Sequence, residues 1–279
     1  MLISSQILLK KAQQEHYAVG AFNTSDLEIT KGIVSASEEM NSPIILQTSE
    51  GEIVHSGKDI FFNAMKIFAE KSKTPINLNL DHGKSFEMCK WAVDIGYNSV
   101  MIDGSKLSLD ENIKLTKQVV DYAHERSVVV EGEIGLVPTP DKGEEVKILK
   151  ADPNECKKFV EETGLDFLAV GIGNVHGENK GKPILDFERL SEICKVVSIP
   201  LVLHGGSGIS DLDIKKAISM GICKINVNTE LRQAFVKSLR ESLEDEDVIK
   251  PYDIMEPVED VIKKVVEKKI EIFGSKNKI

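Results

Sequence analysis

The chain has 279 residues, of which 41% are hydrophobic and 29% are charged, a composition typical of a folded globular protein rather than a disordered or fibrous one. Its formal net charge of −10 argues against a nucleic-acid partner, because the positive charge that neutralises phosphates is missing. Four widely spaced cysteines, no long apolar run and no leader-like N-terminus predict a cytoplasmic protein without a disulfide framework or membrane spans.

Eight short runs rich in β-branched residues recur along the chain and predict buried parallel strands. In chain order they span residues 18–23, 43–49, 76–82, 99–104, 128–133, 167–173, 199–204 and 222–226. Helical segments separate them, so we predict an α/β fold, a (β/α)8 TIM barrel in a single domain over residues 1–279. An open doubly wound sheet is the alternative. It is less favoured because no Gly-x-Gly-x-x-Gly motif follows the first strand.

Several residues predict where the helices begin. Ser25 with Glu28, and Ser108 with Glu111, have the spacing of a capping box. Asp152-Pro153 predicts an N-cap followed by a proline in the first helical turn.

Glycines predict where helices end, and two further helices follow the last strand. The expected C-terminal caps are Gly96, Gly164 and Gly221. An amphipathic helix is predicted from about Glu230, and a final one over residues 258–273 that stops at Gly274. We expect these extra C-terminal helices to cover the barrel or a partner subunit.

The C-terminal ends of the strands carry the active site in barrel enzymes. Three of the six histidines lie at or just beyond strands three, six and seven, and each precedes a glycine: His82, His176 and His204. Three neutral imidazoles with an open fourth position make a catalytic zinc site, in which the metal is a Lewis acid. A single such histidine is more often a hydrogen-bonded loop residue, but the three together favour a metal site.

Acidic residues also lie at the predicted strand ends. Asp81 directly precedes His82 and suits a proton shuttle beside the metal, although it is also placed to cap a helix that begins near Ser85. Asp103 and Glu133 are expected to orient the histidines or to bind a second divalent or monovalent cation. Helix capping and salt bridging are the alternatives for these two carboxylates.

The loops after strands seven and eight have the features of a phosphate site. Barrels commonly bind phosphate at these two loops, through backbone N–H groups and a helix N-terminus. A glycine cluster alone is typical of a plain turn, but its place after strand seven favours phosphate binding. The residues concerned are Gly205, Gly206 and Ser207, and then Asn226, Val227, Asn228 and Thr229.

Seven stretches of the chain resemble the class II, metal-dependent ketose-bisphosphate aldolases, of the fructose-bisphosphate and tagatose-bisphosphate type. They run in the family's order from the first strand to the C-terminus. The stretches are AFNT at 21–24, LDHG at 80–83, SVMID at 99–103, GNVHG at 173–177, LHGGSG at 203–208, KINVNT at 224–229 and IFGS at 272–275.

This resemblance implies zinc on the three histidines, with Asp103 and Glu133 near an alternative metal position. It implies that Asp81 exchanges the proton of the C4 hydroxyl, and that Asn23 and Ser49 line the pocket. The dihydroxyacetone-phosphate half of the substrate would be held by Gly177, Lys180, Gly205, Gly206, Ser207, Asn226, Val227, Asn228 and Thr229.

The chain departs from the family pattern in a loop and near the C-terminus. Family members carry a mobile-loop glutamate that handles the carbon-bound proton; Glu145 is our choice for it, with Glu144 as the alternative. The family's Asp-Pro-Arg, whose arginine reaches a neighbouring subunit's distal phosphate, is replaced by Lys250-Pro-Tyr252. We therefore expect a weakly held distal phosphate unless Arg232 or Arg240 replaces that contact, and a homodimer or homotetramer.

The function predicted from these features is a zinc-dependent aldolase. It would reversibly cleave a ketose bisphosphate, foremost fructose 1,6-bisphosphate, to dihydroxyacetone phosphate and glyceraldehyde 3-phosphate. Tagatose bisphosphate, or another ketose that releases dihydroxyacetone phosphate, is an alternative substrate. A Schiff-base aldolase would need a buried lysine such as Lys224, and a non-catalytic barrel subunit is the alternative from a different functional class.

Overall fold

The computed structural model describes residues 1–138, 149–177 and 184–279. Eight parallel strands in these ranges form a closed barrel, in which each strand pairs with its sequence neighbours and the last pairs with the first. The predicted TIM barrel is therefore confirmed, and the open sheet is wrong. The strands are β1 (Val19–Asn23), β2 (Ile44–Ser49), β3 (Ile76–Gly83), β4 (Ser99–Ile102), β5 (Val129–Ile134), β6 (Phe167–Val170), β7 (Leu201–Leu203) and β8 (Ile222–Val227).

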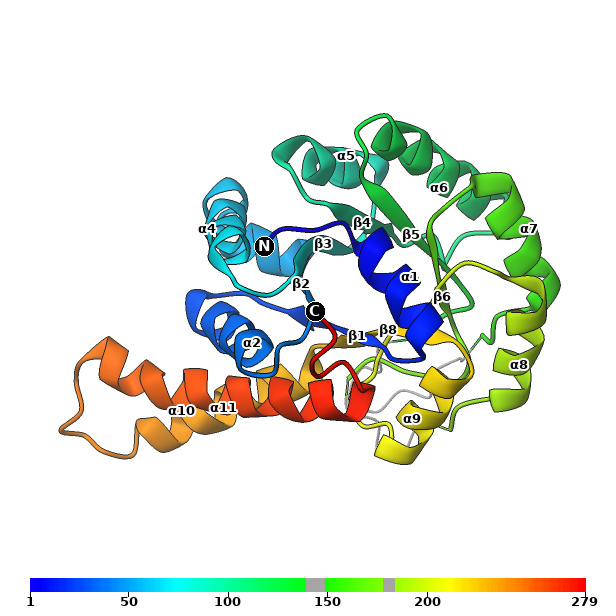
Figure 1. Cartoon of the computed structure of the whole chain (residues 1–279). Coiled ribbons are helices and arrows are strands. Elements are labelled where there is room, and N and C mark those ends of the chain that lie inside the picture. The colour runs from blue at the N-terminus through cyan, green and yellow to red at the C-terminus, as the bar shows by residue number, and fades with distance from the viewer. Residues whose placement is uncertain (139–148, 178–183) are drawn as a thin grey trace.

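Helices surround the barrel and connect successive strands (Figure 1). Two of them, α3 and α4, lie in the single connection between β2 and β3. The described helices are α1 (Ser5–Glu15), α2 (Leu27–Glu39), α3 (Glu50–His55), α4 (Lys58–Lys71), α5 (Phe86–Ile95), α6 (Leu109–His124), α7 (Pro153–Thr163), α8 (Phe187–Val196), α9 (Asp211–Ser219), α10 (Thr229–Ser242) and α11 (Pro251–Phe273).

Two of the three predicted helix starts are confirmed. Ser108 and Glu111 form a complete capping box at α6, and the Asp152 side chain caps α7. The start predicted at Ser25 is wrong by one residue. Asp26 is the N-cap of α2, and its carboxylate accepts a hydrogen bond from the Ile29 N–H at 2.8 Å.

The predicted C-terminal caps hold at two positions. Gly96 and Gly164 end α5 and α7 in the left-handed conformation that glycine adopts without a Cβ clash. Helix α9 is capped one residue earlier than expected, by Met220, and Gly221 follows it with a φ of 120°. The positive φ at Gly221 turns the chain from α9 into β8.

Helix α1, which the sequence analysis did not anticipate, lies across the end of the barrel at which the strands begin (Figure 1). Leu8 and Leu9 are buried in one apolar cluster with strand residues such as Val19 and Phe167. The Ile3 N–H donates to the carbonyl of Ile76, the first residue of β3. Because α1 covers this end, the cavity of the barrel opens at the opposite end.

Helices α10 and α11 pack together and extend beyond the barrel wall as an arm, which comprises residues 229–273 (Figure 1). Helix α11 begins at Pro251, seven residues before the predicted start at 258, because proline is well suited to the first helical position. It ends at Gly274 as predicted. No helix among the described residues is both long and apolar enough to cross a bilayer.

Candidate active site

A cavity of about 620 Å³ lies at the C-terminal ends of the strands, within the size range of small-ligand sites. Most residues that the sequence analysis assigned to the site line this cavity. They are Asn23, Ser49, Asp81, His82, Asp103, His176, Gly177, Gly205, Ser207, Asn226, Asn228 and Thr229. Gly206 and Val227 lie buried behind the lining. Glu144, Glu145 and Lys180 fall outside the described residues.

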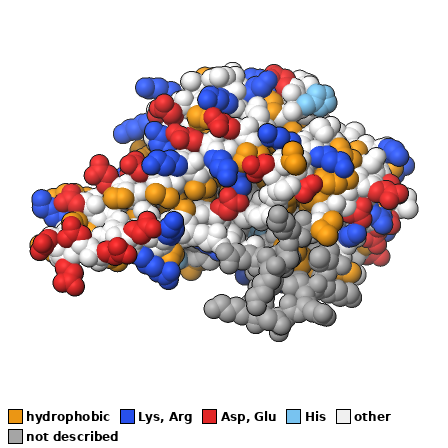
Figure 2. All heavy atoms as spheres, turned by 90° about the horizontal axis from the view of Figure 1, so that it is seen from below, with side chains coloured by type: hydrophobic (Ala, Val, Ile, Leu, Met, Phe, Trp, Pro, Cys, Tyr) orange, Lys and Arg blue, Asp and Glu red, His pale blue; other side chains and the backbone are white. Residues whose placement is uncertain are grey.

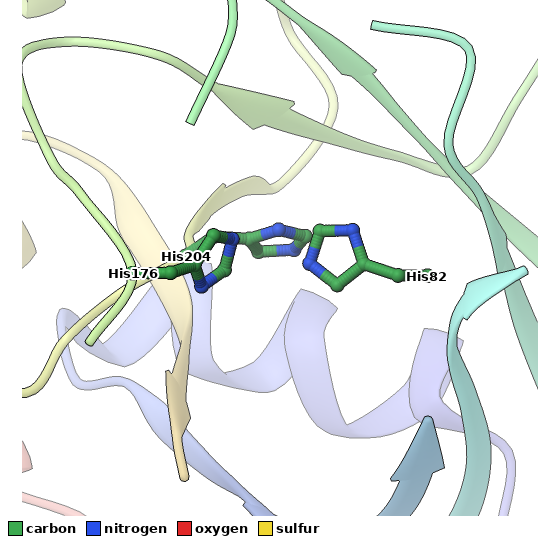
Figure 3. Close-up of side chains that lie close together, drawn as sticks. All are labelled: His82, His176 and His204. Carbon is green, nitrogen blue, oxygen red and sulfur yellow. The ribbon is translucent and has the colours of Figure 1, made fainter. Parts of the chain in front are cut away.

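The three histidines from different strand ends converge, with their rings facing one another (Figure 3). The ring of His82 lies 4.6 Å from that of His204 and 5.0 Å from that of His176, measured between centroids. One nitrogen of each ring lies within 4.8 Å of the other two. The barrel thus brings together side chains that are up to 122 residues apart in sequence, the separation of His82 from His204. Three imidazole nitrogens gathered in this way have the geometry of a tridentate metal site.

The nitrogens that face the centre of this cluster have no hydrogen-bond partner among the described residues. They are Nε2 of His82, Nε2 of His176 and Nδ1 of His204, and all three are buried. Buried polar atoms are nearly always paired, so three unpaired nitrogens at one point require an explanation. A divalent metal with an open coordination position fits this donor set.

Carboxylates bind the opposite nitrogens of two of these rings. His82 Nδ1 lies 2.9 Å from Asp103 Oδ2, and His204 Nε2 lies 2.7 Å from Glu131 Oε1. A carboxylate on one nitrogen fixes the ring and leaves the other nitrogen as the metal donor. Asp103 therefore contacts a histidine of the cluster rather than capping a helix.

Glu133 lies beside the inward nitrogen of His204. Its Oε2 atom is 3.0 Å from His204 Nδ1, but the contact lacks hydrogen-bond geometry and both atoms are unpaired. The carboxylate is almost fully buried. A cation at the cluster would therefore have this oxygen near it as well as the histidine nitrogens.

The histidines differ in proton affinity when no metal is present. Burial alone would lower the pKa of His204, but the hydrogen bond to Glu131 and the nearby negative charge of Glu133 raise it to about 10. Burial and the neighbouring charged histidines lower the pKa of His176 to about 3. A metal must therefore displace a proton from His204, so metal affinity falls as the pH falls.

Sequence reasoning missed Glu131, which links the cluster to a buried lysine. Lys224 Nζ lies 2.6 Å from Glu131 Oε2, and both side chains are buried inside the barrel. This ion pair engages the lysine that a Schiff-base mechanism would use as nucleophile, so the structure does not favour that alternative. Glu131 lies two positions before Glu133 on one strand, and this same-face spacing was the available indication of its role.

The backbone at His82 is strained. His82 has a φ of 48°, and the pairing of β3 with β4 shifts in register between Leu80 and Gly83. Such conformations cost about 1–3 kcal/mol and are concentrated at functional sites. A Cβ at Gly83 would lie 2.7 Å from Cys89 Sγ, so glycine is needed for the close packing that follows the bend.

A second glycine brings the other two histidines together. Gly205 has a φ of 61°, and a Cβ there would lie 2.1 Å from the carbonyl oxygen of Val175. The Asn174 side chain donates to the His204 carbonyl at 3.0 Å. These contacts join the loops after β6 and β7 and thereby hold His176 near His204.

Asp81 lies at the cavity with both carboxylate oxygens bound. Asn226 Nδ2 donates to Oδ1 and Asn23 Nδ2 donates to Oδ2, each at 3.0 Å. Helix α5 is capped by Ser85, so the capping alternative for Asp81 is wrong. Burial would raise the pKa of Asp81, but the positive charge of His82 and other neighbours outweighs it and lowers the pKa. The carboxylate is therefore ionised and able to accept a proton.

The loops after β7 and β8 meet at the N-terminus of α10. The Gly206 N–H donates to the Asn226 carbonyl at 3.1 Å, and the Glu230 N–H donates to Ser207 Oγ at 3.4 Å. Asn228 is the N-cap residue, but its side chain makes no capping hydrogen bond. A helix start that lacks a side-chain cap and faces a cavity suits an anion.

The residues named in place of the family's arginine lie in different parts of the molecule. Arg232 lines the cavity, whereas Arg240 is exposed on α10 and is not among the lining residues. Tyr252 is 68% exposed in the first turn of α11, on the arm. Within the described chain, only Arg232 of these three is therefore placed to contact a ligand of this cavity.

Comparison with known proteins agrees with this geometry. A family model described as "Fructose-bisphosphate aldolase class-II" matches residues 3–278. The chain belongs to this family. A fructose-bisphosphate aldolase of Geobacillus stearothermophilus is 45% identical and one of Staphylococcus epidermidis 43% identical, over 99% of this chain and 98–99% of theirs. The crystal structure of the YdjI aldolase from Escherichia coli K12 superposes with a TM-score of 0.91 at 38% identity, covering 100% of this chain and 99% of that one.

Class II aldolases are metal-dependent lyases, so membership places an enzyme active site in this barrel. The resemblance derived from seven short stretches is confirmed over essentially the whole chain. The non-catalytic barrel subunit gains no support from either the relatives or the cavity.

Proposed function

We propose that this class II aldolase uses zinc and reversibly cleaves a ketose bisphosphate, foremost fructose 1,6-bisphosphate, to dihydroxyacetone phosphate and glyceraldehyde 3-phosphate. The observation that carries the proposal is the set of three buried, unpaired histidine nitrogens at one end of the barrel. His82, His176 and His204 would hold the zinc, with Asp103 and Glu133 near a second cation position. Zinc there would supply a Lewis acid that polarises the C2 carbonyl and stabilises the enediolate.

Asp81 is the base in this proposal. Its carboxylate accepts the proton of the C4 hydroxyl as the C3–C4 bond breaks, and C4 becomes the aldehyde carbon of the leaving product. The electron pair of the broken bond passes toward the C2 carbonyl and gives the enediolate of dihydroxyacetone phosphate. Asn23 and Asn226 orient the carboxylate by their hydrogen bonds.

The remaining roles are protonation of the enediolate carbon and binding of the two ends of the substrate. Glu145 delivers the proton to the carbon of the enediolate, which completes dihydroxyacetone phosphate. Asn23 and Ser49 line the pocket at the other end of the substrate. The phosphate-bearing half is held by Gly177, Lys180, Gly205, Gly206, Ser207, Asn226, Val227, Asn228 and Thr229.

A cleavage assay across ketose phosphates, coupled to detection of dihydroxyacetone phosphate, tests the function. We expect a chelator to abolish turnover and zinc to restore it, while borohydride with substrate leaves the enzyme active. Undiminished turnover in the fully metal-stripped protein would contradict the proposal. Parallel assays with tagatose 1,6-bisphosphate decide the C4 stereochemistry.

A further inference from the structure

A buried carboxylate lies directly behind one wall of the cavity. Glu52, in α3, is 7% exposed and accepts four hydrogen bonds. Its Oε1 accepts from Asn228 Nδ2 at 3.1 Å and from Arg232 Nη2 at 2.5 Å. Its Oε2 accepts from Asn23 Nδ2 at 3.0 Å and from the Ser49 N–H at 2.8 Å. All four donor residues line the cavity, so Glu52 gathers polar groups that otherwise face a ligand.

The most important of these donors is the arginine. Arg232 has a side chain that is 59% exposed at the cavity, yet its guanidinium is paired with Glu52. Charge-assisted pairs of this kind are among the stronger hydrogen bonds. A ligand phosphate that approaches Arg232 therefore competes with the Glu52 carboxylate for the guanidinium. The negative charge of Glu52, just behind the cavity wall, also repels the phosphate.

The Glu52 group lies next to the proposed base, and it contacts the proposed phosphate loops through Asn228, at the end of the loop after β8. Asn23 Nδ2 donates both to Glu52 and to Asp81, at 3.0 Å each. His82 lies in β3, His176 lies in the loop after β6 and His204 directly follows β7, and the phosphate loops follow β7 and β8. The part of the cavity at the ends of β1 and β2 then accommodates the end of the ketose beyond C4. This placement rests on the proposed function.

We propose that Glu52 is a specificity-determining residue that withholds Arg232 from a second phosphate. This sector of the cavity then binds the second phosphate of a ketose bisphosphate less tightly than it would with a free guanidinium. Glu52 acts through Arg232 and Asn23, so it is a positioning residue rather than a catalytic one.

Kinetics of Glu52→Gln on two substrates test the proposal. The measured quantity is the ratio of kcat/KM for fructose 1,6-bisphosphate to kcat/KM for fructose 1-phosphate. We expect the variant to raise this ratio by about tenfold or more, chiefly through a lower KM for the bisphosphate, because the guanidinium becomes free to bind the distal phosphate. Glu52→Ala should shift the ratio in the same direction.

A double-mutant cycle identifies the arginine as the group that Glu52 withholds. Arg232→Gln should leave the ratio within about twofold in the parent and should abolish the gain in the Glu52→Gln background. Arg240→Gln is the matched control, because Arg240 lies on the same helix but outside the cavity lining. It should leave the ratio unchanged in both backgrounds.

Two results would overturn the proposal while leaving the proposed function intact. One is an equal loss of kcat/KM on both substrates in the two Glu52 variants, which indicates a merely structural role. The other is a fall in the ratio for Arg232→Gln in the parent, since Arg232 would then already bind the second phosphate. A zinc-loaded parent that releases dihydroxyacetone phosphate from neither ketose overturns the proposed function, and this inference with it.

Discussion

Asp81 is the side chain whose surroundings best fit acid–base work. It is ionised, buried and held by two amides beside the histidine cluster. We expect Asp81→Ala to lower kcat by roughly 10²-fold or more, because the C4 hydroxyl loses its proton acceptor. Zinc content per chain should stay near that of the parent. Loss of zinc from the variant would instead make Asp81 a structural support of His82.

Glu131 offers a test of how the cluster is oriented. Its hydrogen bond to His204 Nε2 fixes the nitrogen that faces the metal position. We expect Glu131→Gln to weaken zinc affinity by about 10- to 100-fold, as loss of an outer partner of a metal ligand does. A competition titration with a chromophoric chelator measures the affinity, and thermal unfolding of the metal-free variant controls for loss of the ion pair with Lys224. Unchanged affinity would show that His204 is oriented by its packing alone.

The role of Glu145 as the proton donor to the enediolate carbon is assigned by resemblance, so the test must measure that proton transfer alone. We expect Glu145→Ala to suppress the exchange of the carbon-bound hydrogen of dihydroxyacetone phosphate with solvent, measured by NMR in deuterium oxide. The same measurement on Glu144→Ala is the matched control. Equal exchange in the Glu145 variant and the parent would move the role to Glu144 or elsewhere.

Strand-end position made many of the site residues predictable. His82 and His204 stand at strand ends followed by glycine, and the barrel closes those ends into one rim. Glu52 and Glu131 were not predicted, because their partners Arg232 and His204 lie 180 and 73 residues away in sequence. For Glu131 the same-face spacing with Glu133 was the local indication, but it did not point to His204 or Lys224 as the partner.

The contact between α2 and α11 depends on one residue without a side chain. A Cβ at Gly32 would lie 2.8 Å from the carbonyl oxygen of Glu259 and 2.8 Å from Ile262 Cγ2. We expect Gly32→Ala to lower the free energy of unfolding by about 1–3 kcal/mol, because backbone must shift to relieve the overlap. Urea unfolding measures the change. Gly51→Ala, in a helix where nothing lies within 4 Å, is the control and should be neutral or slightly stabilising.

At the same scale, the strands were more predictable than the helix ends. Buried parallel strands leave continuous apolar runs, and each of the eight predicted runs overlaps one strand, with β3, β5 and β8 extending one residue beyond their runs. The seventh begins only at Leu201 because Pro200 has no N–H to donate to a ladder. Helix α1 was not predicted, because its apolar side chains are buried by contact with strand residues far away in the sequence.

At the scale of the whole molecule, the arm is the feature that the barrel does not account for. Figure 2 shows it projecting from the body, with acidic side chains gathered toward its end and a row of apolar ones along it. Leu243, Ile249 and Tyr252 are more than half exposed, at 56%, 81% and 68%. Contiguous exposed apolar side chains commonly mark an interface. We therefore keep the prediction that the enzyme assembles as a homodimer or homotetramer.

Light scattering coupled to size exclusion tests this prediction, since one chain has a mass of 30.9 kDa. We expect the parent to elute at a mass of two or four chains. Ile249→Asp should shift the population toward the monomer, because a charge buried at an apolar interface without a partner is costly. Leu212→Asp is the control: Leu212 is 80% exposed on α9, outside the arm, and its replacement should not change the mass. A monomeric parent, or equal effects of the two substitutions, would show that the arm is not the interface.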